Sequence, residues 1–502
     1  MPDASQSPAP AEPVSIPAAL KRIAAEKPDA RAVTFVAGGE ARSLSWDELH
    51  RRSNRMARAL AAQGVKFGDF VTIAVPNSLG FIEAAYAVWK LGAVPQPVSS
   101  RLPQAELDAI VALAKTPVVI GADGLTTKRP VFSIEGLLAA SEDDSDLPDA
   151  VSPSWKAPTS GGSTGRPKLI VSGAPAYIDL GNHALWRLNA NDIVLMPGPL
   201  YHNGPFGTAF GALQIGAEVV LMPKFDAEAT LRNIAAYRVS WAYFVPTMMG
   251  RIWRLPEDVR AQYDVSSLRT IWHLAAPCPA WLKEEWIKWL GADVVWELYG
   301  GTEATGATTI SGHEWLTHKG SVGKPIEGCI MKAFDEAGNE LPPGETGEIY
   351  MKRAPGYAAT YRYIGAEPRT LADGWESIGD IGWFDAEGYL YLADRRSDMI
   401  LVGGANIYPA EVEAALEEHP LVASSAVIGL PDEDLGNRVH AIIQARPGLD
   451  LDDLQRHLAE RLVIYKRPRS FELVSENVRD DAGKVRRSAL REERIAKLKS
   501  RN

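Results

Sequence analysis

The sequence has little of what several classes of protein require. Only Cys278 and Cys329 occur among 502 residues, so neither a disulfide scaffold nor a cysteine-based metal site is expected. The 53 lysines and arginines are outnumbered by 63 aspartates and glutamates, and the net charge of −10 argues against broad binding to nucleic acid or anionic membranes. No apolar run reaches the length of a membrane span. We therefore expect a cytoplasmic protein without nucleic-acid partners or integral membrane association.

The beginning of the chain also lacks a targeting feature. In MPDASQSPAPAEPVS no basic residue is followed by an apolar stretch, so a secretory signal is not expected. Residues 1–15 are predicted to be a disordered tail. With 502 residues, of which 46% are apolar, the chain can form two or more domains with substantial cores.

What the chain does contain is an alternation of strand and helix patterns. Residues 69–98 pass from a β-rich segment through an amphipathic helix into a short strand, which predicts a β–α–β unit. The segments AEVVLMPKF and VSWAYFVPT continue the alternation, so we predict an α/β fold up to about residue 390.

From Asp394 the composition changes. DRRSDMILVGGANIYP is charged, then apolar, then glycine-rich, and it is followed by a helix, two strands and another helix. This change indicates a separate α+β domain. We expect a large domain over residues 16–396 and a small mobile domain over 397–502, with a hinge near Ser397.

Residues 158–171, PTSGGSTGRPKLIV, form a glycine-rich loop. It is not a Walker motif, because an Arg-Pro dipeptide separates the last glycine from Lys168. Gly161 and Gly162 would still let backbone N–H groups turn toward an anion, and Lys168 would add a positive charge. From these residues alone, a solvated surface loop and a phosphate cradle are equally well supported.

Four further motifs follow in the chain: WELYGGTEATG, GWESIGDIGWFD, DRRSDMILVGGANIYPAEVE and DDAGKVRRSAL. Together with SGGSTGRPK they resemble, in the same order, the motifs of the adenylate-forming superfamily, which includes acyl- and aryl-CoA ligases. The resemblance covers about residues 16–490. It implies a large α/β domain of the acyl-CoA synthetase type, a small mobile α+β C-terminal domain, and an enzyme that uses ATP, Mg²⁺ and CoA.

The resemblance implies a nucleotide site. The glycine-rich loop would close over the β- and γ-phosphates of ATP. The ring of Tyr299 would lie against adenine, Thr302 would meet the α-phosphate, and Glu303 would hold Mg²⁺. Asp380 would accept both ribose hydroxyls, with Arg395 nearby. The expected ATP and AMP contacts are Ser160, Gly161, Gly162, Ser163, Thr164, Gly165, Lys168, Ala275, Ala276, Pro277, Tyr299, Gly300, Gly301, Thr302, Asp380, Arg395 and Lys484.

Lys484 matches the lysine that bridges the substrate carboxylate and the α-phosphate during adenylation. The small domain would then turn about Ser397, withdraw Lys484 and present a glycine pair beside the pantetheine channel. The expected CoA contacts are Gly403, Gly404, Tyr465, Lys466 and Arg467. The catalytic candidates are Lys484, Thr302, Glu303 and His202, and Glu303 is the metal ligand.

The motif PLYHNGPF contains His202. A lone histidine usually serves packing or lies on the surface, but the resemblance makes His202 a wall or gate of the acyl pocket. The expected pocket residues are His202, Asn203, Gly204, Phe244, Ala275, Leu298, Gly300, Thr305 and Gly306. Many are small and none is an evident cationic clamp, which favours a bulky, mainly apolar acid: aryl, steroid-like or medium- to long-chain. The resemblance within the superfamily is to ligases for bile acids, steroid side chains or aryl-alkanoic acids.

Several positions depart from the superfamily pattern: Gly161 where serine is usual, Ile378 where threonine is usual, Asp394 where glycine is usual, and Ser397 where aspartate or lysine is usual. Two alternatives to a CoA ligase stay open. One is an adenylation enzyme that loads a carrier protein, and the other, which the departures at Gly161 and Ser397 keep open, is a nucleotide-binding sensor without catalysis. Homodimers are common in the superfamily, but the oligomeric state cannot be inferred from the sequence.

Overall fold

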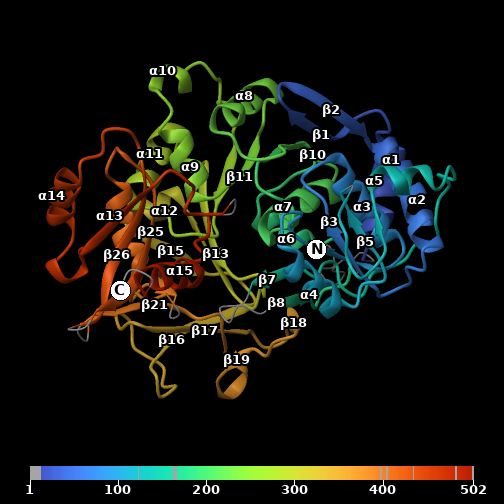
Figure 1. Ribbon diagram of the computed structural model, residues 1–502. Coiled ribbons are helices and arrows are strands. Elements are labelled where there is room, and N and C mark those ends of the chain that lie inside the picture. Colours follow the sequence, from blue (N-terminus) through green and yellow to red (C-terminus); the bar gives the residue numbers. More distant parts are fainter. Residues whose placement is uncertain are drawn as a thin grey trace, which may run out of the picture. The chain divides into compact units, whose positions relative to one another are not determined.

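The computed structural model describes residues 13–122, 124–161, 167–395, 398–402, 405–432, 435–480 and 483–499. The chain folds into two compact units. Unit 1 comprises residues 1–160, 167–194 and 200–223, and unit 2 comprises residues 161–166, 195–199 and 224–502. Both units combine helices with strands, so the predicted α/β class is confirmed (Figure 1).

In the first part of the chain, helices separate most of the strands. The elements up to residue 221 are α1 (Ile16–Glu26), β1 (Arg31–Ala37), β2 (Glu40–Ser45), α2 (Trp46–Ala62), β3 (Phe70–Ala74), α3 (Leu79–Lys90), β4 (Val94–Pro97), α4 (Gln104–Ala114), β5 (Val119–Gly121), β6 (Val131–Phe132), α5 (Ile134–Ala139), β7 (Thr159–Gly161), β8 (Pro167–Ser172), α6 (Leu180–Leu185), β9 (Ile193–Met196), α7 (Asn203–Gln214) and β10 (Glu218–Leu221).

Two groups of paired strands organise unit 1. In the first, β4, β3, β5 and β6 lie side by side in that order, and all their pairings are parallel. In the second, β1 lies between β10, its parallel neighbour, and β2, its antiparallel neighbour. Helix α3 joins the parallel strands β3 and β4, so the β–α–β unit predicted for residues 69–98 is confirmed.

Helix α3 is buried on every side. All of its residues after the first are buried, including Glu83, which pairs with Arg52, and Lys90, which donates to Asn54. Tyr86 and Trp89 contact the ring of Phe210 on α7, with ring centroids 5.8 and 5.0 Å apart in edge-on geometry. Such aromatic pairs contribute about 0.5–1.5 kcal/mol each beyond the area they bury. They hold α7, whose first residues belong to the predicted acyl pocket.

In unit 2, strands dominate up to about residue 395. Its elements are α8 (Ala227–Tyr237), β11 (Trp241–Phe244), α9 (Pro246–Trp253), α10 (Glu257–Arg260), β12 (Thr270–His273), α11 (Ala280–Leu290), β13 (Val295–Gly300), β14 (Ala307–Ser311), α12 (Gly312–Thr317), β15 (Ser321–Pro325), β16 (Cys329–Phe334), β17 (Gly347–Arg353), β18 (Tyr361–Ile364), β19 (Arg369–Thr370), η1 (Ala372–Gly374), β20 (Glu376–Ser377), β21 (Asp380–Phe384), β22 (Leu390–Arg395), β23 (Ile400–Val402), β24 (Ala405–Ile407), α13 (Pro409–Glu417), β25 (Val422–Asp432), β26 (Gly436–Ala445), α14 (Leu451–Arg461), η2 (Ile464–Lys466), β27 (Ser470–Val474) and α15 (Arg487–Lys499).

The main sheet of unit 2 is mixed. Its strands follow one another in the order β19, β20, β17, β21, β22, β15, β14, β13, β12 and β11. Strands β11, β12 and β13 pair in parallel, whereas β13, β14 and β15 pair in antiparallel fashion. The carboxyl ends of parallel strands are the usual place for a ligand site in an α/β sheet. His273 closes β12 at this edge, and Tyr299 and Gly300 close β13.

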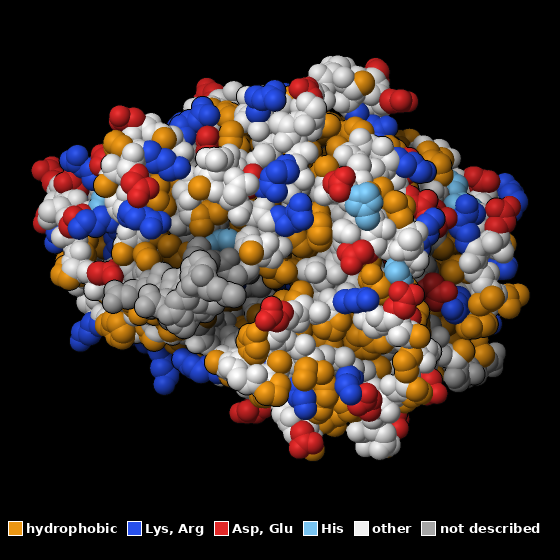
Figure 2. All heavy atoms as spheres, turned by 180° about the vertical axis from the view of Figure 1, so that it is seen from behind, with side chains coloured by type: hydrophobic (Ala, Val, Ile, Leu, Met, Phe, Trp, Pro, Cys, Tyr) orange, Lys and Arg blue, Asp and Glu red, His pale blue; other side chains and the backbone are white. Residues whose placement is uncertain are grey.

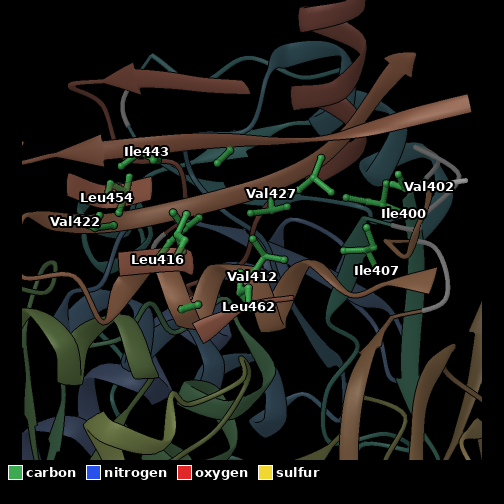
Figure 3. Close-up of a cluster of buried hydrophobic side chains, with 14 residues drawn as sticks. Ile400, Val402, Ile407, Val412, Leu416, Val422, Val427, Ile443, Leu454 and Leu462 are labelled. Carbon is green, nitrogen blue, oxygen red and sulfur yellow. The ribbon is translucent and has the colours of Figure 1, made fainter. Parts of the chain in front are cut away.

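A smaller sheet of β25, β26 and β27 forms the core of the C-terminal part of unit 2. Because side chains alternate along a strand, β25 faces two different cores. Val427 joins a cluster with Val412 and Leu416 of α13, which Figure 3 shows facing one another. The neighbouring Ile428 joins the opposite cluster, which includes Leu490 of α15. The sheet is thereby covered on both faces, as the α+β prediction for this part of the chain requires.

The surface carries charges of both signs. On the face shown in Figure 2, lysine and arginine side chains are interspersed with aspartate and glutamate. A continuous basic surface of the kind that binds nucleic acid is not seen on this face. Among the residues that the structure describes, no helix has both the length and the apolar character needed to cross a membrane.

Candidate active site

The end of β13 and the turn that follows it carry the motif YGGTE. Tyr299 and Gly300 are the last residues of β13 and pair with Thr308 and Ala307 of β14. The turn between the strands is closed by a hydrogen bond from the Ala304 N–H to the Gly301 carbonyl. A Cβ atom at Gly301 would lie 2.7 Å from Oε2 of Glu303, so a side chain at this position would collide with that carboxylate.

Tyr299 and Asp380 lie 81 positions apart in sequence and meet in the structure. The hydroxyl of Tyr299 donates a hydrogen bond of 2.6 Å to Oδ2 of Asp380, the first residue of β21. Asp380 is buried, and the tyrosine hydroxyl compensates part of the cost of burying a carboxylate. A hydrogen bond therefore joins Tyr299, which is predicted to contact adenine, to Asp380, which is predicted to bind ribose.

Glu303 is buried, and two residues of the 360–363 segment bond its carboxylate and its backbone carbonyl. Tyr363 donates a hydrogen bond of 2.5 Å to Oε1 of Glu303, and Thr360 donates one of 2.7 Å to its backbone carbonyl. Burial and the charge of Glu303 raise the pKa of the Tyr363 hydroxyl, so it remains a protonated donor. Neither Tyr363 nor Thr360 was predicted from the sequence.

A second hydrogen-bonded group adjoins the first. Thr305, a predicted pocket residue, donates to Oε2 of Glu376 at 3.2 Å, and Tyr361 donates to the same oxygen at 2.9 Å. The rings of Tyr361 and Tyr363 are in contact, with centroids 4.8 Å apart. Thr305, Tyr361 and Glu376 border a cavity of about 270 Å³. Its lining includes Thr305, Lys352, Arg353, Thr360, Tyr361, Asp373 and Glu376.

The predicted adenine segment, residues 275–277, follows β12. Ala275 has a φ of 74°, which a non-glycine residue rarely adopts. Near this segment, Nζ of Lys283 on α11 lies 2.5 Å from Oε2 of Glu297 on β13, with both side chains almost fully buried. The fully buried His273 lies 3.8 Å from the same oxygen. Burial and the charge of Lys283 lower the pKa of His273 well below its ordinary value, so this histidine is neutral.

Lys484 follows a tight turn. The N–H of Gly483 donates to the backbone carbonyl of Asp480 at 2.9 Å. The N–H of Lys484 donates to Oδ1 of the same aspartate, also at 2.9 Å. Gly483 has a φ of +75°, which suits glycine. A Cβ atom at Gly483 would lie 3.0 Å from Oγ1 of Thr247, just after β11. Gly483, directly before the predicted adenylation lysine, therefore lies against Thr247. Thr247 follows closely after Phe244, a fully buried residue of the predicted acyl pocket.

Other predicted pocket residues belong to unit 1. His202 is the N-cap residue of α7, and Asn203 and Gly204 begin the helix. The sequence analysis missed Lys156, which donates a hydrogen bond to Oδ1 of Asn203 and lies 3.9 Å from the ring of Trp155. Burial lowers the pKa of Lys156 to about 7. In the sequence, Lys156 stands beside the apolar residues Trp155, Ala157 and Pro158, and nothing in this pattern distinguishes it from a solvent-exposed lysine.

The predicted CoA-contact residues Tyr465, Lys466 and Arg467 differ in their exposure and in their partners. Tyr465 is half-exposed. Nζ of Lys466 lies 2.7 Å from Glu411. Arg467 donates to the carbonyls of Leu462 and Ala459 and so closes the end of α14. Tyr465 is thus the exposed group, whereas Lys466 and Arg467 already have partners.

Part of the predicted site lies outside the described residues. Lys168 lies in β8. Ser160, Gly161 and Arg395 lie in strands, and the side chains of Ser160 and Arg395 are outside the described part of the structure. The remaining predicted positions outside the described residues are Gly162, Ser163, Thr164, Gly165, Ser397, Gly403 and Gly404.

Comparison with known families gives two matches that cover most of the chain. The model of the AMP-binding enzyme family matches residues 20–362, and the model of the AMP-binding enzyme C-terminal domain matches residues 411–484.

Three curated relatives share about a third of their residues with this chain. A fatty acid–[acyl-carrier-protein] ligase of Streptomyces coeruleorubidus is 32% identical, with 90% of this chain and 92% of that protein covered. A feruloyl-CoA synthase of an Amycolatopsis species is 33% identical, with 94% and 97% covered. A Rhodococcus jostii enzyme, 3-[(3aS,4S,7aS)-7a-methyl-1,5-dioxo-octahydro-1H-inden-4-yl]propanoyl:CoA ligase, is 31% identical, with 96% and 99% covered.

Solved structures share the fold over almost the whole chain. The anthranilate CoA ligase AuaEII in complex with anthranoyl-AMP superposes with a TM-score of 0.81 at 25% identity, covering 99% of both chains. The o-succinylbenzoate CoA synthetase of Bacillus subtilis in complex with ATP and a magnesium ion has a TM-score of 0.77 at 28% identity, covering 95% of this chain and 99% of that one. Family, sequence relatives and fold agree, and this chain belongs to the AMP-binding enzyme family and is an AMP-forming acid–thiol ligase.

Proposed function

We propose that this enzyme joins a bulky, mainly apolar carboxylic acid to the thiol of CoA in two steps. In the first, the carboxylate attacks the α-phosphorus of ATP, which gives acyl-AMP and pyrophosphate. In the second, the CoA thiol attacks the acyl carbonyl, loses its proton and displaces AMP. The observation that carries the proposal is the meeting of Tyr299, Asp380 and the Glu303 turn at the carboxyl end of β13, in a chain of the AMP-binding family.

In this scheme each group has one task. The ring of Tyr299 lies against adenine, and the Tyr299–Asp380 hydrogen bond keeps the Asp380 carboxylate ready to accept the ribose hydroxyls. Thr302 donates to the α-phosphate, where negative charge develops in the transition state. Ala275, Ala276 and Pro277 border the base. The glycine-rich loop that ends at Lys168 encloses the β- and γ-phosphates.

Glu303 fits the role of a magnesium ligand. Its carboxylate is buried and oriented by Tyr363, and Gly301 leaves room beside its second oxygen, where a side chain would intrude. A single buried carboxylate suits Mg²⁺, because this ion is usually held by one or two carboxylates together with substrate phosphates. Bound there, the ion would neutralise phosphate charge.

Lys484 is the group that we assign to adenylation. Its ammonium bridges the acid's carboxylate and the α-phosphate and offsets the charge of the transition state. We further propose a large domain over residues 16–396 and a small domain over 397–502 that turns about Ser397 between the steps. The turn withdraws Lys484 and presents Gly403 and Gly404 to CoA.

The acid is proposed to be aryl, steroid-like or medium- to long-chain. The predicted pocket residues are mostly small or apolar, and two relatives are named for bulky acids, the feruloyl-CoA synthase and the ligase for the fused-ring indenyl propanoate. Lys156 adds one hydrogen-bond donor beside Asn203, which suits an acid with a polar oxygen far from its carboxylate. A preference for acetate or propionate would contradict this assignment.

A carrier protein is the one alternative to CoA as the thiol acceptor of the second step. The relative named as a fatty acid–[acyl-carrier-protein] ligase favours a carrier protein as an alternative thiol. Both acceptors present a phosphopantetheine thiol, so the first step is common to them. The acceptor is decided by offering CoA and a holo carrier protein in parallel.

The test is pyrophosphate release across a panel of carboxylic acids, with and without CoA, for the wild type and for Lys484→Ala. We expect release to depend on one class of bulky acid, and a thioester to form only when CoA is added. If no acid yields pyrophosphate while ATP still binds, the chain is a nucleotide-binding sensor and the proposed function is wrong.

A further inference from the structure

Two carboxylates of helix α13 hold the segment that leads to Lys484. Glu413 and Glu417 lie one helical turn apart and share a face of the helix. Nη2 of Arg479 lies 2.8 Å from Oε2 of Glu413 and 3.2 Å from Oε1 of Glu417. The side chain of Arg479 is 11% exposed, so little water screens these charges.

The same guanidinium also bonds the lysine turn. Nη1 of Arg479 donates to the carbonyl of Gly483, directly before Lys484, at 3.3 Å. Asp480 closes the turn from the other side, since its backbone N–H donates to the Lys484 carbonyl at 2.9 Å. Arg479 is thus the connection between α13 and the backbone that carries Lys484.

The carboxylates themselves are fixed by strand β25. The N–H of Val427 donates to Oε1 of Glu413 at 2.8 Å, and the N–H of Ser425 donates to Oε1 of Glu417 at 2.9 Å. Burial disfavours the charged form of Arg479, but Glu417 and Glu413 outweigh burial and raise its pKa, so the residue stays a cation. The anchor of the turn is therefore a rigid, fully charged cluster.

A second arginine extends this cluster toward the predicted hinge. Nη2 of Arg487 lies 2.8 Å from Oε1 of Glu413, and Nη1 lies 2.6 Å from Oδ2 of Asp398, the neighbour of Ser397. Arg479 shares Glu413 with Arg487 and in addition donates to the carbonyl of Gly483.

We propose that Arg479 is a positioning residue for Lys484: it ties the backbone of Gly483, directly before the lysine, to Glu413 and Glu417 so that the lysine ammonium is held for adenylation. The proposal rests on the proposed function in assigning adenylation to Lys484. Arg479 itself touches neither ATP nor acid in this scheme. It is needed for acyl-AMP formation and not for thioester formation, during which Lys484 is withdrawn.

The experiment measures the two half-reactions separately in the full-length Arg479→Met variant. Methionine preserves much of the side-chain volume and removes the charge and the donors. Because a displacement of about 1 Å costs about 100-fold in rate, we expect acyl-AMP formation to fall by about that factor. Thioester formation from preformed acyl-AMP and CoA should keep the wild-type rate, and Arg479→Lys should restore part of the adenylation rate.

Two further variants guard the interpretation. Arg456→Met removes an exposed arginine of the same domain, whose ion pair with Asp453 is on the surface, and should leave both half-reactions unchanged. Glu417→Gln weakens the anchor while leaving Glu413 in place, and it takes over the test if Arg479→Met does not fold. In all variants, the reactivity of Lys484 toward an acylating reagent is followed by mass spectrometry and should rise when the turn is released.

Every outcome of these measurements either supports or overturns the positioning role of Arg479. Loss of adenylation with retention of the thioester step supports the proposal. Equal loss of both steps means that Arg479 only stabilises the domain, and full retention of adenylation means that it has no role; either result overturns the proposal. If the wild type adenylates no acid, the proposed function fails by itself. Equal Lys484 reactivity in wild type and Arg479→Met would then overturn the positioning role independently.

Discussion

Tyr299 donates its hydroxyl to Asp380, and this hydrogen bond of 2.6 Å joins the end of β13 to the start of β21. The two strands do not neighbour each other in the sheet. A side-chain contact, and not strand pairing, therefore holds together the halves of the proposed adenosine site.

Tyr299→Phe should weaken ATP binding. The substitution keeps the ring and removes the donor to Asp380, and a hydrogen bond to a charged group contributes about 1.5–3 kcal/mol, so the KM for ATP should rise at least about 10-fold. Steady-state kinetics with varied ATP measures this. Tyr391→Phe is the matched control, because Tyr391 donates to Asp385 outside the site, and its KM should not change. An unchanged KM in Tyr299→Phe would refute the role of the pair.

Lys484→Ala should abolish acyl-AMP formation and spare the conversion of preformed acyl-AMP with CoA. The loss follows from removing the one cation assigned to the α-phosphate during adenylation. Single-turnover measurements of each half-reaction test it. Lys497→Ala, an exposed lysine on α15, should behave as wild type. Adenylation that survives in Lys484→Ala would show that another group supplies this charge.

Lys283→Met should destabilise the protein strongly. It leaves Glu297 as an unpaired carboxylate in a buried place, which costs about 3–5 kcal/mol. Chemical denaturation followed by tryptophan fluorescence measures the free energy of unfolding. The double variant with Glu297→Gln should recover a large part of the loss, because no buried charge then remains. A double variant as unstable as the single one would show that packing against Trp315, and not charge, is decisive.

The stability contributed by Lys156 should increase with pH. Its pKa is lowered to about 7 by burial, so between that value and the ordinary value of 10.5 the unfolded chain binds a proton that the folded protein does not. Folding therefore becomes more favourable as pH rises through this range. Below about pH 7 the lysine is protonated in both states, and the burial penalty is fully present.

The measurement is the difference in unfolding free energy between wild type and Lys156→Met at pH 7 and pH 9. The free energy of unfolding of the wild type, relative to that of the variant, should be higher at pH 9 than at pH 7. Lys66→Met, which removes an exposed lysine of the same unit, should show no such trend. A difference that does not change with pH would contradict the low pKa of Lys156.

The sequence suggested those site candidates that lie in contiguous motifs. From YGGTE it predicted roles for Tyr299 and Glu303; Tyr299 lies at the end of β13 and Glu303 in the turn that follows, and their roles stay predictions. The β–α–β unit at residues 69–98 was likewise evident from hydrophobic periodicity, because one helix and two strands determine that pattern locally.

The partners of those residues could not be found in this way. Tyr363, Glu376 and Arg479 are ordinary polar residues in the linear chain, and each acquires its role from a contact with a distant segment. Local periodicity and motif spacing record which backbone conformation a segment prefers, but they do not record which side chain will face it.

The sequence alone therefore predicted the family and the α/β class, because these depend on residue type and motif order, and it supplied the proposed roles of Lys484 and Glu303. Only the tertiary structure decided how those groups are held: Tyr363 on Glu303, Tyr299 on Asp380, and Arg479 between α13 and the lysine turn. The physical reason is that hydrogen bonds and ion pairs act over a few ångströms, so they exist only after folding has brought distant residues together.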